Sequence, residues 1–161
     1  MKVIGLDLSL TNTGFAYITQ DSYTTYSIKS KLKGVARLNE IYNEVKSKLR
    51  DCDLVVIEGY GFGSQKAHSL GELGGLIKFL LYNEKYKVMI VPPTVLKKFL
   101  TGKGNSDKSI MMMTTYKKYG VEITDDNQVD AYVLAKLGQM YFKKNKTLKE
   151  KEILSKVTFL Q

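Results

Sequence analysis

A chain of 161 residues can bury one core but is too short for two ordinary domains, so we expect one domain over residues 1–145 and a basic C-terminal tail over residues 146–161. The hydrophobic content of 43% argues against disorder, and the single cysteine excludes an intramolecular disulfide or a cysteine zinc cluster. The chain begins with an apolar run rather than a secretory signal, and its most apolar segment (residues 74–82) is far below spanning length, so we expect a cytoplasmic protein with no membrane partner.

The net charge of +9 is distributed unevenly along the chain. Residues 94–118 hold six lysines and one aspartate, and residues 143–161 hold six lysines and two glutamates, whereas residues 119–142 hold one lysine and four acids. A basic chain with one acidic island is typical of a nuclease that grips phosphates around a cation site. A lysine-rich surface that only keeps the protein soluble is the alternative, and charge alone does not separate the two.

The first half of the chain alternates strands and helices. The pattern predicts a β-hairpin over residues 2–19, a strand at 23–30, an amphipathic helix over 32–49, a buried strand at 53–58 and a helix over 64–82. The second half predicts a strand at 87–93 that its prolines stop, a short helix at 94–100, a helix ending on Gly120 and a last helix beginning near Asp126. This order predicts an α/β domain with a mixed sheet and an antiparallel N-terminal hairpin, and only the last 15 or so residues look loosely attached.

Three acids stand at the ends of apolar elements. Asp7 ends the run VIGL, Glu58 ends the buried run LVVI, and Asp130 lies in the acidic island. A carboxylate at the end of a buried strand costs free energy unless something compensates it. Hard divalent cations such as Mg²⁺ or Mn²⁺ prefer oxygen ligands, so the three acids together suggest a metal site for phosphoryl chemistry.

The last helix offers two further candidate ligands. Asn127 and Asp130 are three residues apart, and Asp126 and Asp130 are four apart, so either pair projects from one helix face. An aspartate before such a helix is also a common N-cap, and for Asp125 or Asp126 the cap is the favoured interpretation on local sequence alone.

Four segments, IGLDLSLTNTGFAYI, VVIEGYGFG, VLKKFLTGKGNSDKSIMM and NQVDAYVLA, resemble in order and spacing the RuvC-type Holliday junction resolvases of the RNase H-like nuclease superfamily, in a compact bacteriophage-type form. The resemblance covers most of residues 1–140. It implies an RNase H-like fold with helices on both faces of the sheet. It also implies a homodimer that binds four-way DNA junctions and nicks two strands, with Mg²⁺ or Mn²⁺ as cofactor.

The resemblance assigns roles by position. Asp7, Glu58 and Asp130 match the acids of the family's metal site, and Lys97 and Lys108 match its functional lysines. Lys108 is the stronger of the two because it begins a helix, where a phosphate also meets free backbone N–H groups. Further contacts to DNA are expected from the lysines and aromatic residues near the site, namely Lys98, Lys103, Tyr60 and Phe62. For the two aromatic residues, packing under the glycine-rich loop is an equally good explanation.

One position departs from the family pattern. Asn127 stands where the family has an acid or a histidine, and an amide oxygen brings no negative charge. Three explanations are open: a natural variant, replacement of the missing acid by Asp126, or an inactivating substitution of an aspartate, which we favour. A shift of one residue rotates a helical side chain by about 100°, which argues against replacement by Asp126.

The same motifs are compatible with other functions. The glycine and threonine turn near residue 13 also holds ATP phosphates in sugar kinases and heat-shock ATPases, but those proteins need two such lobes, and this chain has room for one. A nuclease acting on RNA or DNA·RNA hybrids would share the fold and metal chemistry. A module that binds branched DNA without cutting it is the third alternative, which Asn127 keeps open.

Overall fold

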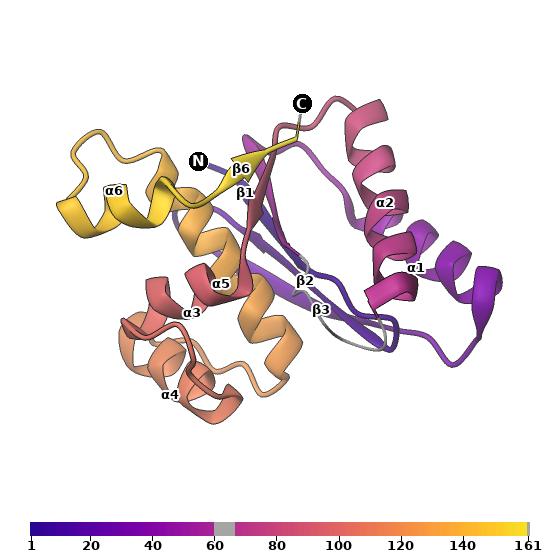
Figure 1. The fold of residues 1–161 in the computed structure, drawn as a ribbon, viewed down its shortest axis with the longest axis horizontal. Helices are drawn as coiled ribbons and strands as arrows, with labels where there is room; N and C mark the ends of the chain where they lie inside the picture. The colour runs from indigo at the N-terminus through magenta and orange to yellow at the C-terminus, as the bar shows by residue number, and fades with distance from the viewer. Residues whose placement is uncertain (60–66, 161) are drawn as a thin grey trace.

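The computed structural model describes residues 1–59 and 67–160, and the described residues form one mixed sheet covered by helices (Figure 1). The strand order is β3-β2-β1-β4-β5-β6. Strands β1, β2 and β3 pair antiparallel, β4 and β5 run parallel to β1, and β6 is antiparallel to β5. Their bounds are β1 (Val3–Asp7), β2 (Asn12–Ile18), β3 (Tyr23–Lys29), β4 (Leu54–Glu58), β5 (Val88–Val91) and β6 (Thr158–Phe159).

Helices lie on both sides of the sheet, in two groups (Figure 1). One core cluster joins the sheet to α1 (Gly34–Lys48) and α2 (Ala67–Asn83). A second cluster joins the opposite face to α3 (Pro93–Thr101), α4 (Lys108–Tyr119), α5 (Asp126–Tyr141) and α6 (Leu148–Leu154). The predicted α/β architecture, with its antiparallel N-terminal hairpin and helices on both faces, is therefore confirmed.

Alternation along β1 decides which side chains face which helices. Ile4 and Leu6 belong to the core under α1 and α2, whereas Val3 belongs to the core under α5. Because successive side chains of a strand point to opposite faces, Gly5 and Asp7 share the α5 face with Val3.

Two glycines let α5 lie directly on the hairpin. A Cβ atom at Gly5 would lie 1.9 Å from the Ala131 carbonyl oxygen, and one at Gly14 would lie 2.0 Å from the Asn127 carbonyl oxygen. Both distances are far below van der Waals contact, so any larger residue would push the helix away from β1 and β2. The close approach brings the first turns of α5 to the end of β1, where Asp7 lies.

The ends of the helices follow local sequence signals. Asp125 caps α5 by accepting a hydrogen bond from the Gln128 amide at 3.1 Å, which confirms the cap expected at Asp125 or Asp126. Asp107 caps α4 in the same way, and Gly120 ends that helix in the left-handed conformation with φ of 66°. Asn12 in the β1–β2 hairpin also donates to Asp125, at 2.8 Å. Hydrogen bonds within the helix and to the hairpin thus hold the start of α5 in place.

The expectation that the last 15 or so residues, within the predicted tail 146–161, are loosely attached is wrong. Thr147 and Glu150 form a capping box that begins α6, and Ile153 is buried at 2% exposure. Beyond the helix, β6 pairs with β5, with Phe159 opposite Met89. Apolar burial and backbone pairing both hold this segment on the domain. Among the helices of the described residues, none is long and apolar enough to cross a membrane.

We predict that Gly5→Ala destabilises the protein by about 1–3 kcal/mol or more, because the new methyl group collides with the backbone of α5. The measurement is urea unfolding followed by circular dichroism. Gly71→Ala is the matched control, since a Cβ atom at Gly71 in α2 meets nothing within 4 Å. There the helix preference of alanine should stabilise the protein by up to about 1 kcal/mol. Equal effects of the two substitutions would contradict the proposed close contact.

Candidate active site

The first two acids of the predicted site end neighbouring parallel strands. Leu6 of β1 is paired with Ile57 of β4, so Asp7 and Glu58, the next residues along each strand, lie side by side at one edge of the sheet. Val56, two residues before Glu58, belongs to the core under α5. Alternation therefore directs both carboxylates to the α5 face of the sheet.

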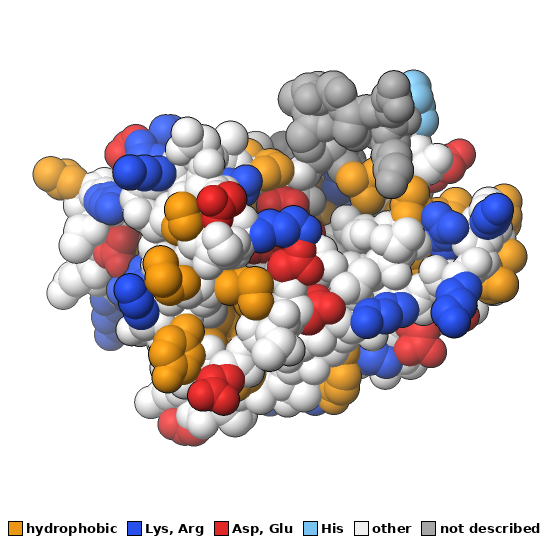
Figure 2. All heavy atoms as spheres, turned by 90° about the horizontal axis from the view of Figure 1, so that it is seen from below, with side chains coloured by type: hydrophobic (Ala, Val, Ile, Leu, Met, Phe, Trp, Pro, Cys, Tyr) orange, Lys and Arg blue, Asp and Glu red, His pale blue; other side chains and the backbone are white. Residues whose placement is uncertain are grey.

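The third acid comes from α5. Asp130 lies in the second turn of the helix, close enough to raise the pKa of both Asp7 and Glu58 by charge repulsion. The structure therefore brings together three predicted residues that are up to 123 positions apart in sequence. Figure 2, which views the molecule from below, shows acidic side chains with basic ones beside them near the middle of this face.

The three carboxyl groups lie in a poorly solvated environment and repel one another. Asp7 is only 7% exposed. Its burial, followed by the charges of Glu58 and Asp130, raises its pKa well above the ordinary value. Burial and the charge of Asp130 raise the pKa of Glu58 to about 7. Burial and the charge of Asp126 raise the pKa of Asp130 to about 6. The site therefore favours bound protons, or another source of positive charge, near neutral pH.

Asp7 and Glu58 also share a hydrogen bond, which raises the pKa of Asp7 and lowers that of Glu58. A hydrogen bond between two carboxyl groups requires a proton on one of them. A divalent cation that bound here would have to displace this proton. Its affinity should therefore rise with pH as the carboxyl groups ionise.

The donor set suits a hard cation. Carboxylate oxygens are the ligands that Mg²⁺ and Mn²⁺ prefer, and Mg²⁺ is usually held by one or two carboxylates with water and substrate phosphates. Within residues 1–59 and 67–160, no group of three or more His, Cys, Asp or Glu side chains is arranged to hold a metal ion. The adjacent Asp7–Glu58 pair fits a cation whose other ligands come from water and substrate, and Asp130 lies nearby.

Two lysines bring positive charge to the carboxylates. Lys97 of α3 lowers the pKa of Glu58 and Asp130, and Lys108, the first residue of α4, lowers the pKa of Asp7 and Asp130. The Lys108 side chain is 74% exposed and forms an ion pair with Asp126. These two lysines are the pair that the resemblance assigned to the site. An exposed ammonium group beside buried carboxylates is suitably placed to meet an incoming phosphate.

The polar residues at the start of α5 contact different parts of the structure. Asp125 bonds to the hairpin and the helix backbone, whereas Asp126 turns to Lys108 of α4. Asn127, the next residue, is partly buried, and its backbone carbonyl lies against Gly14. The pairing of Asp126 with Lys108 gives this residue a role other than replacing an acid at position 127. A metal-ligand role for either residue stays a prediction.

The other predicted DNA contacts lie in different places. Lys98 forms an ion pair with Glu152 of α6 at 2.8 Å, and Lys103 is exposed in the turn between α3 and α4. Tyr60 and Phe62 lie outside the described residues. The structure thus joins Lys97 and Lys108 to the carboxylates, while Lys98 is held toward α6.

Sequence reasoning missed residues that hold the β1–β2 turn beside Asp7. The fully buried Thr13 accepts a hydrogen bond from the Ser9 amide at 3.0 Å and donates to the Ser9 carbonyl at 2.7 Å. Gln128 binds β3 through Thr25 at 2.6 Å and Ser27 at 2.9 Å. The polar composition of the turn was visible in the sequence, but its partners depend on the fold.

No family model matches the chain. The chain is 26% identical over 150 residues to crossover junction endodeoxyribonuclease RuvC of Prochlorococcus marinus (strain NATL2A), and the match covers 86% of this chain and 97% of that protein.

Solved structures match over a similar length. The RuvC of Thermus thermophilus in complex with a Holliday junction substrate matches with a TM-score of 0.73 at 17% identity, over 99% of each chain. The fowlpox virus resolvase in complex with Holliday junction DNA matches with a TM-score of 0.61 at 16% identity, over 89% of this chain and all of the other.

The sheet, the helices on its two faces and these matches define an α/β protein with the RNase H-like fold of RuvC, as the sequence predicted. The sequence similarity to RuvC agrees with the resemblance found in the four motifs.

We predict that Glu58→Gln stabilises the protein more at pH 8 than at pH 4. Because the pKa of Glu58 is raised from 4.5 to about 7, the folded state binds the proton more tightly than the unfolded chain does. The resulting stabilisation is complete below pH 4.5 and is lost as the pH rises through 7. Glutamine removes this loss, so urea unfolding should show a gain of about 1–3 kcal/mol at pH 8 and a smaller one at pH 4.

The control for this experiment is Glu122→Gln, at an exposed position. It should change stability by less than about 0.5 kcal/mol at either pH. The same gain for Glu58→Gln at both pH values would contradict the raised pKa.

Proposed function

We propose that this protein is a metal-dependent, structure-selective DNA endonuclease that binds Holliday junctions and other branched DNA and resolves them by paired nicking. The observation that carries the proposal is the meeting of Asp7, Glu58 and Asp130 at one sheet edge, with Lys97 and Lys108 beside them. The similarity to RuvC, one of whose structures contains a Holliday junction substrate, supports the substrate class.

Each group has a part in phosphodiester hydrolysis. Asp7 and Glu58 would be the first ligands of Mg²⁺ or Mn²⁺, and Asp130 and the amide oxygen of Asn127 would complete the site directly or through bound water. The bound cation would supply Lewis acidity and lower the pKa of a water molecule. Lys108 and Lys97 would bind the phosphate that the carboxylates alone would repel. The raised pKa of Glu58, about 7, also lets this residue accept a proton near neutral pH when it is not bound to a cation.

We further propose that the protein acts as a homodimer. Paired nicking of a four-way junction requires two active sites, and the described part of one chain provides a single cluster of these acids. A symmetric dimer presents two such sites to the two-fold symmetry of a junction. Light scattering of the free protein and of its junction complex measures the number of copies.

The general test is a nicking assay on labelled four-way, three-way and linear DNA, with and without Mg²⁺ or Mn²⁺. Metal-dependent, paired nicks in the four-way junction are expected, with little cutting of linear DNA. A DNA·RNA hybrid included in the same assay separates this proposal from a hybrid-specific nuclease. Cutting of the hybrid in preference to the junction would overturn the substrate proposed here.

We predict that Asp7→Asn and Glu58→Gln each abolish cleavage, by more than about 100-fold, and leave junction binding within about threefold of wild type. Both residues are mostly buried among carboxylates, so their removal affects the metal site rather than the phosphate-binding lysines. Gel-based nicking and fluorescence anisotropy measure the two properties. Loss of binding together with cleavage, in variants that are folded and at least as stable as wild type, would contradict the ligand roles.

Asn127 favours a second candidate function, binding of branched DNA without cleavage, because an amide oxygen at a ligand position brings no charge to the cation.

We predict that Asn127→Asp raises Mg²⁺-dependent nicking by about tenfold or more, through the added negative charge at the metal site. Asp126→Asn in the same background tests replacement by the neighbouring acid. No gain on Asn127→Asp would favour a natural variant or replacement of the missing acid by Asp126.

A further inference from the structure

A second basic region lies beyond the candidate active site, in the five residues that leave β3. Lys29, Lys31 and Lys33 occupy alternate positions of this segment, which we call the basic segment (residues 29–33). The chain has no acidic residue between Asp21 and Glu40. Sequence reasoning considered the lysines of residues 94–118 and 143–161 but not these.

The basic segment leaves the sheet at the same edge as the acids. Asp7 of β1 is opposite Gly14 of β2, and Gly14 is opposite Ser27 of β3. Two strand spacings of about 4.8 Å therefore put Ser27 about 10 Å from Asp7. Because β3 runs parallel to β1, Lys29 lies two residues further along, at the end of β3 where the chain passes the carboxylates.

Hydrogen bonds hold the residues between the lysines against the domain. Ser30 is only 7% exposed, and its hydroxyl bonds to the Glu40 carboxylate of α1. The Leu32 amide donates to the Ser30 hydroxyl at 3.2 Å, and Arg37 donates to the Leu32 carbonyl at 2.5 Å. The segment is therefore fixed through its even-numbered residues.

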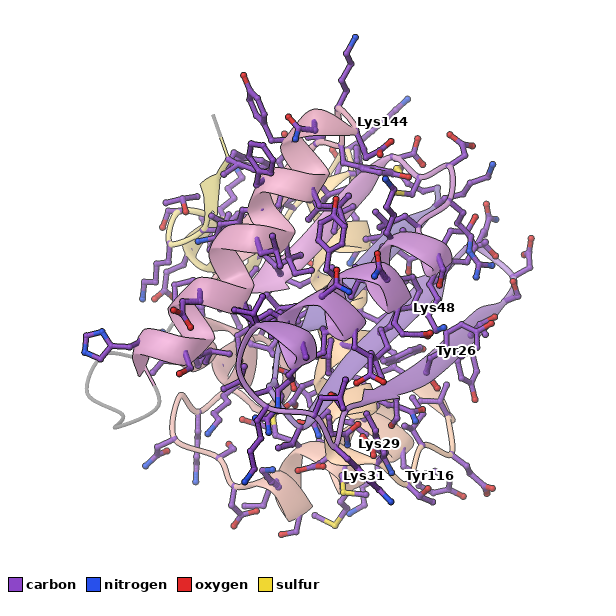
Figure 3. All side chains as sticks on the ribbon, turned by 90° about the vertical axis from the view of Figure 1, so that its right-hand side faces the viewer. Tyr26, Lys29, Lys31, Lys48, Tyr116 and Lys144 are labelled. Atoms are coloured by element: carbon purple, nitrogen blue, oxygen red, sulfur yellow. The ribbon has the colours of Figure 1, made fainter. Side chains whose placement is uncertain are left out.

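The lysines themselves are exposed, and none of the three is in an ion pair with an acid of residues 1–59 and 67–160. The acid nearest in sequence, Glu40, is bound to Ser30. Figure 3 shows Lys29 and Lys31 together at the lower end of the molecule, with Lys144 at the opposite end. Three positive charges without a protein partner form a local positive potential at this edge.

The spacing of these charges suits a nucleic-acid strand. Lys29 belongs to β3, and Lys33 also has an extended backbone, with φ of −132° and ψ of 161°. Alternate residues of an extended chain are about 6.6 Å apart and project to the same side. Two nucleotides of a DNA strand span about 6.8 Å along the helix axis.

We propose that the basic segment binds the phosphate backbone of one duplex arm of the DNA whose junction lies at the carboxylates. The inference rests on the proposed function, because it needs branched DNA at the candidate active site. It adds a contact about 10 Å or more from Asp7, on the β3 side of the site. This contact positions the arm and reads no base sequence.

The test is binding of a labelled four-way junction at 50–200 mM salt without divalent cations, comparing wild type with K29Q/K31Q/K33Q. The slope of log K against log salt is negative, and each lost phosphate contact reduces its magnitude by about 0.9. The slope of the variant should therefore be shallower by about 2–3. Affinity at the lowest salt should fall by about tenfold or more. The variant K29R/K31R/K33R keeps the charges and should keep both values.

The matched control is K144Q/K149Q/K151Q, which removes three charges from exposed lysines in and before α6. It should leave the slope within about 0.5 of wild type. An unchanged slope in K29Q/K31Q/K33Q, or an equal fall in the control, overturns the inference, while junction binding by wild type still supports the proposed function. Failure of wild type to bind the junction overturns both.

Discussion

The repulsion among three buried carboxyl groups is the constraint on which this site depends. Asp7, Glu58 and Asp130 raise one another's pKa in an environment that already disfavours charge. Such an arrangement destabilises the fold unless a proton, an ammonium group or a cation compensates it. This unfavourable arrangement is the reason for the cation site that we propose, to which the carboxylates alone would supply only part of the ligands.

The rest of the fold maintains this arrangement. Parallel pairing of β1 and β4 puts Asp7 beside Glu58, and the absence of side chains at Gly5 and Gly14 lets α5 bring Asp130 over them. Hydrogen bonds from the hairpin and β3 then fix the start of α5. The positions of the three acids therefore depend on the packing of α5 on the β1–β2 hairpin.

Much of this could be predicted from local patterns. Helix periodicity predicted α1 and α5, and acids at the ends of apolar elements predicted the candidate site. Such features need only the few residues around each position. The RNase H-like fold was predicted from four motifs and their order, and the structural matches confirm it.

What the sequence left out depends on pairs of distant residues. The ion pairs of Lys108 with Asp126 and of Lys98 with Glu152 join separate helices, and no local pattern decides between these partners. The C-terminal segment was misjudged because β6 has only two residues, too few for a strand pattern. Its helix did carry a readable signal, since Thr147 and Glu150 have the spacing of a capping box.

The contact between α5 and the hairpin also has a consequence for biosynthesis. More than 100 residues separate Gly14 from Asp126, so a ribosome adding about 5–20 residues per second finishes the hairpin roughly 5–20 s before α5 emerges. During that interval the nascent β1–β2 ribbon has no partner for the side of the sheet that α5 later covers. The acidic centre can therefore form only after α5 has been synthesised, because Asp130 lies on that helix.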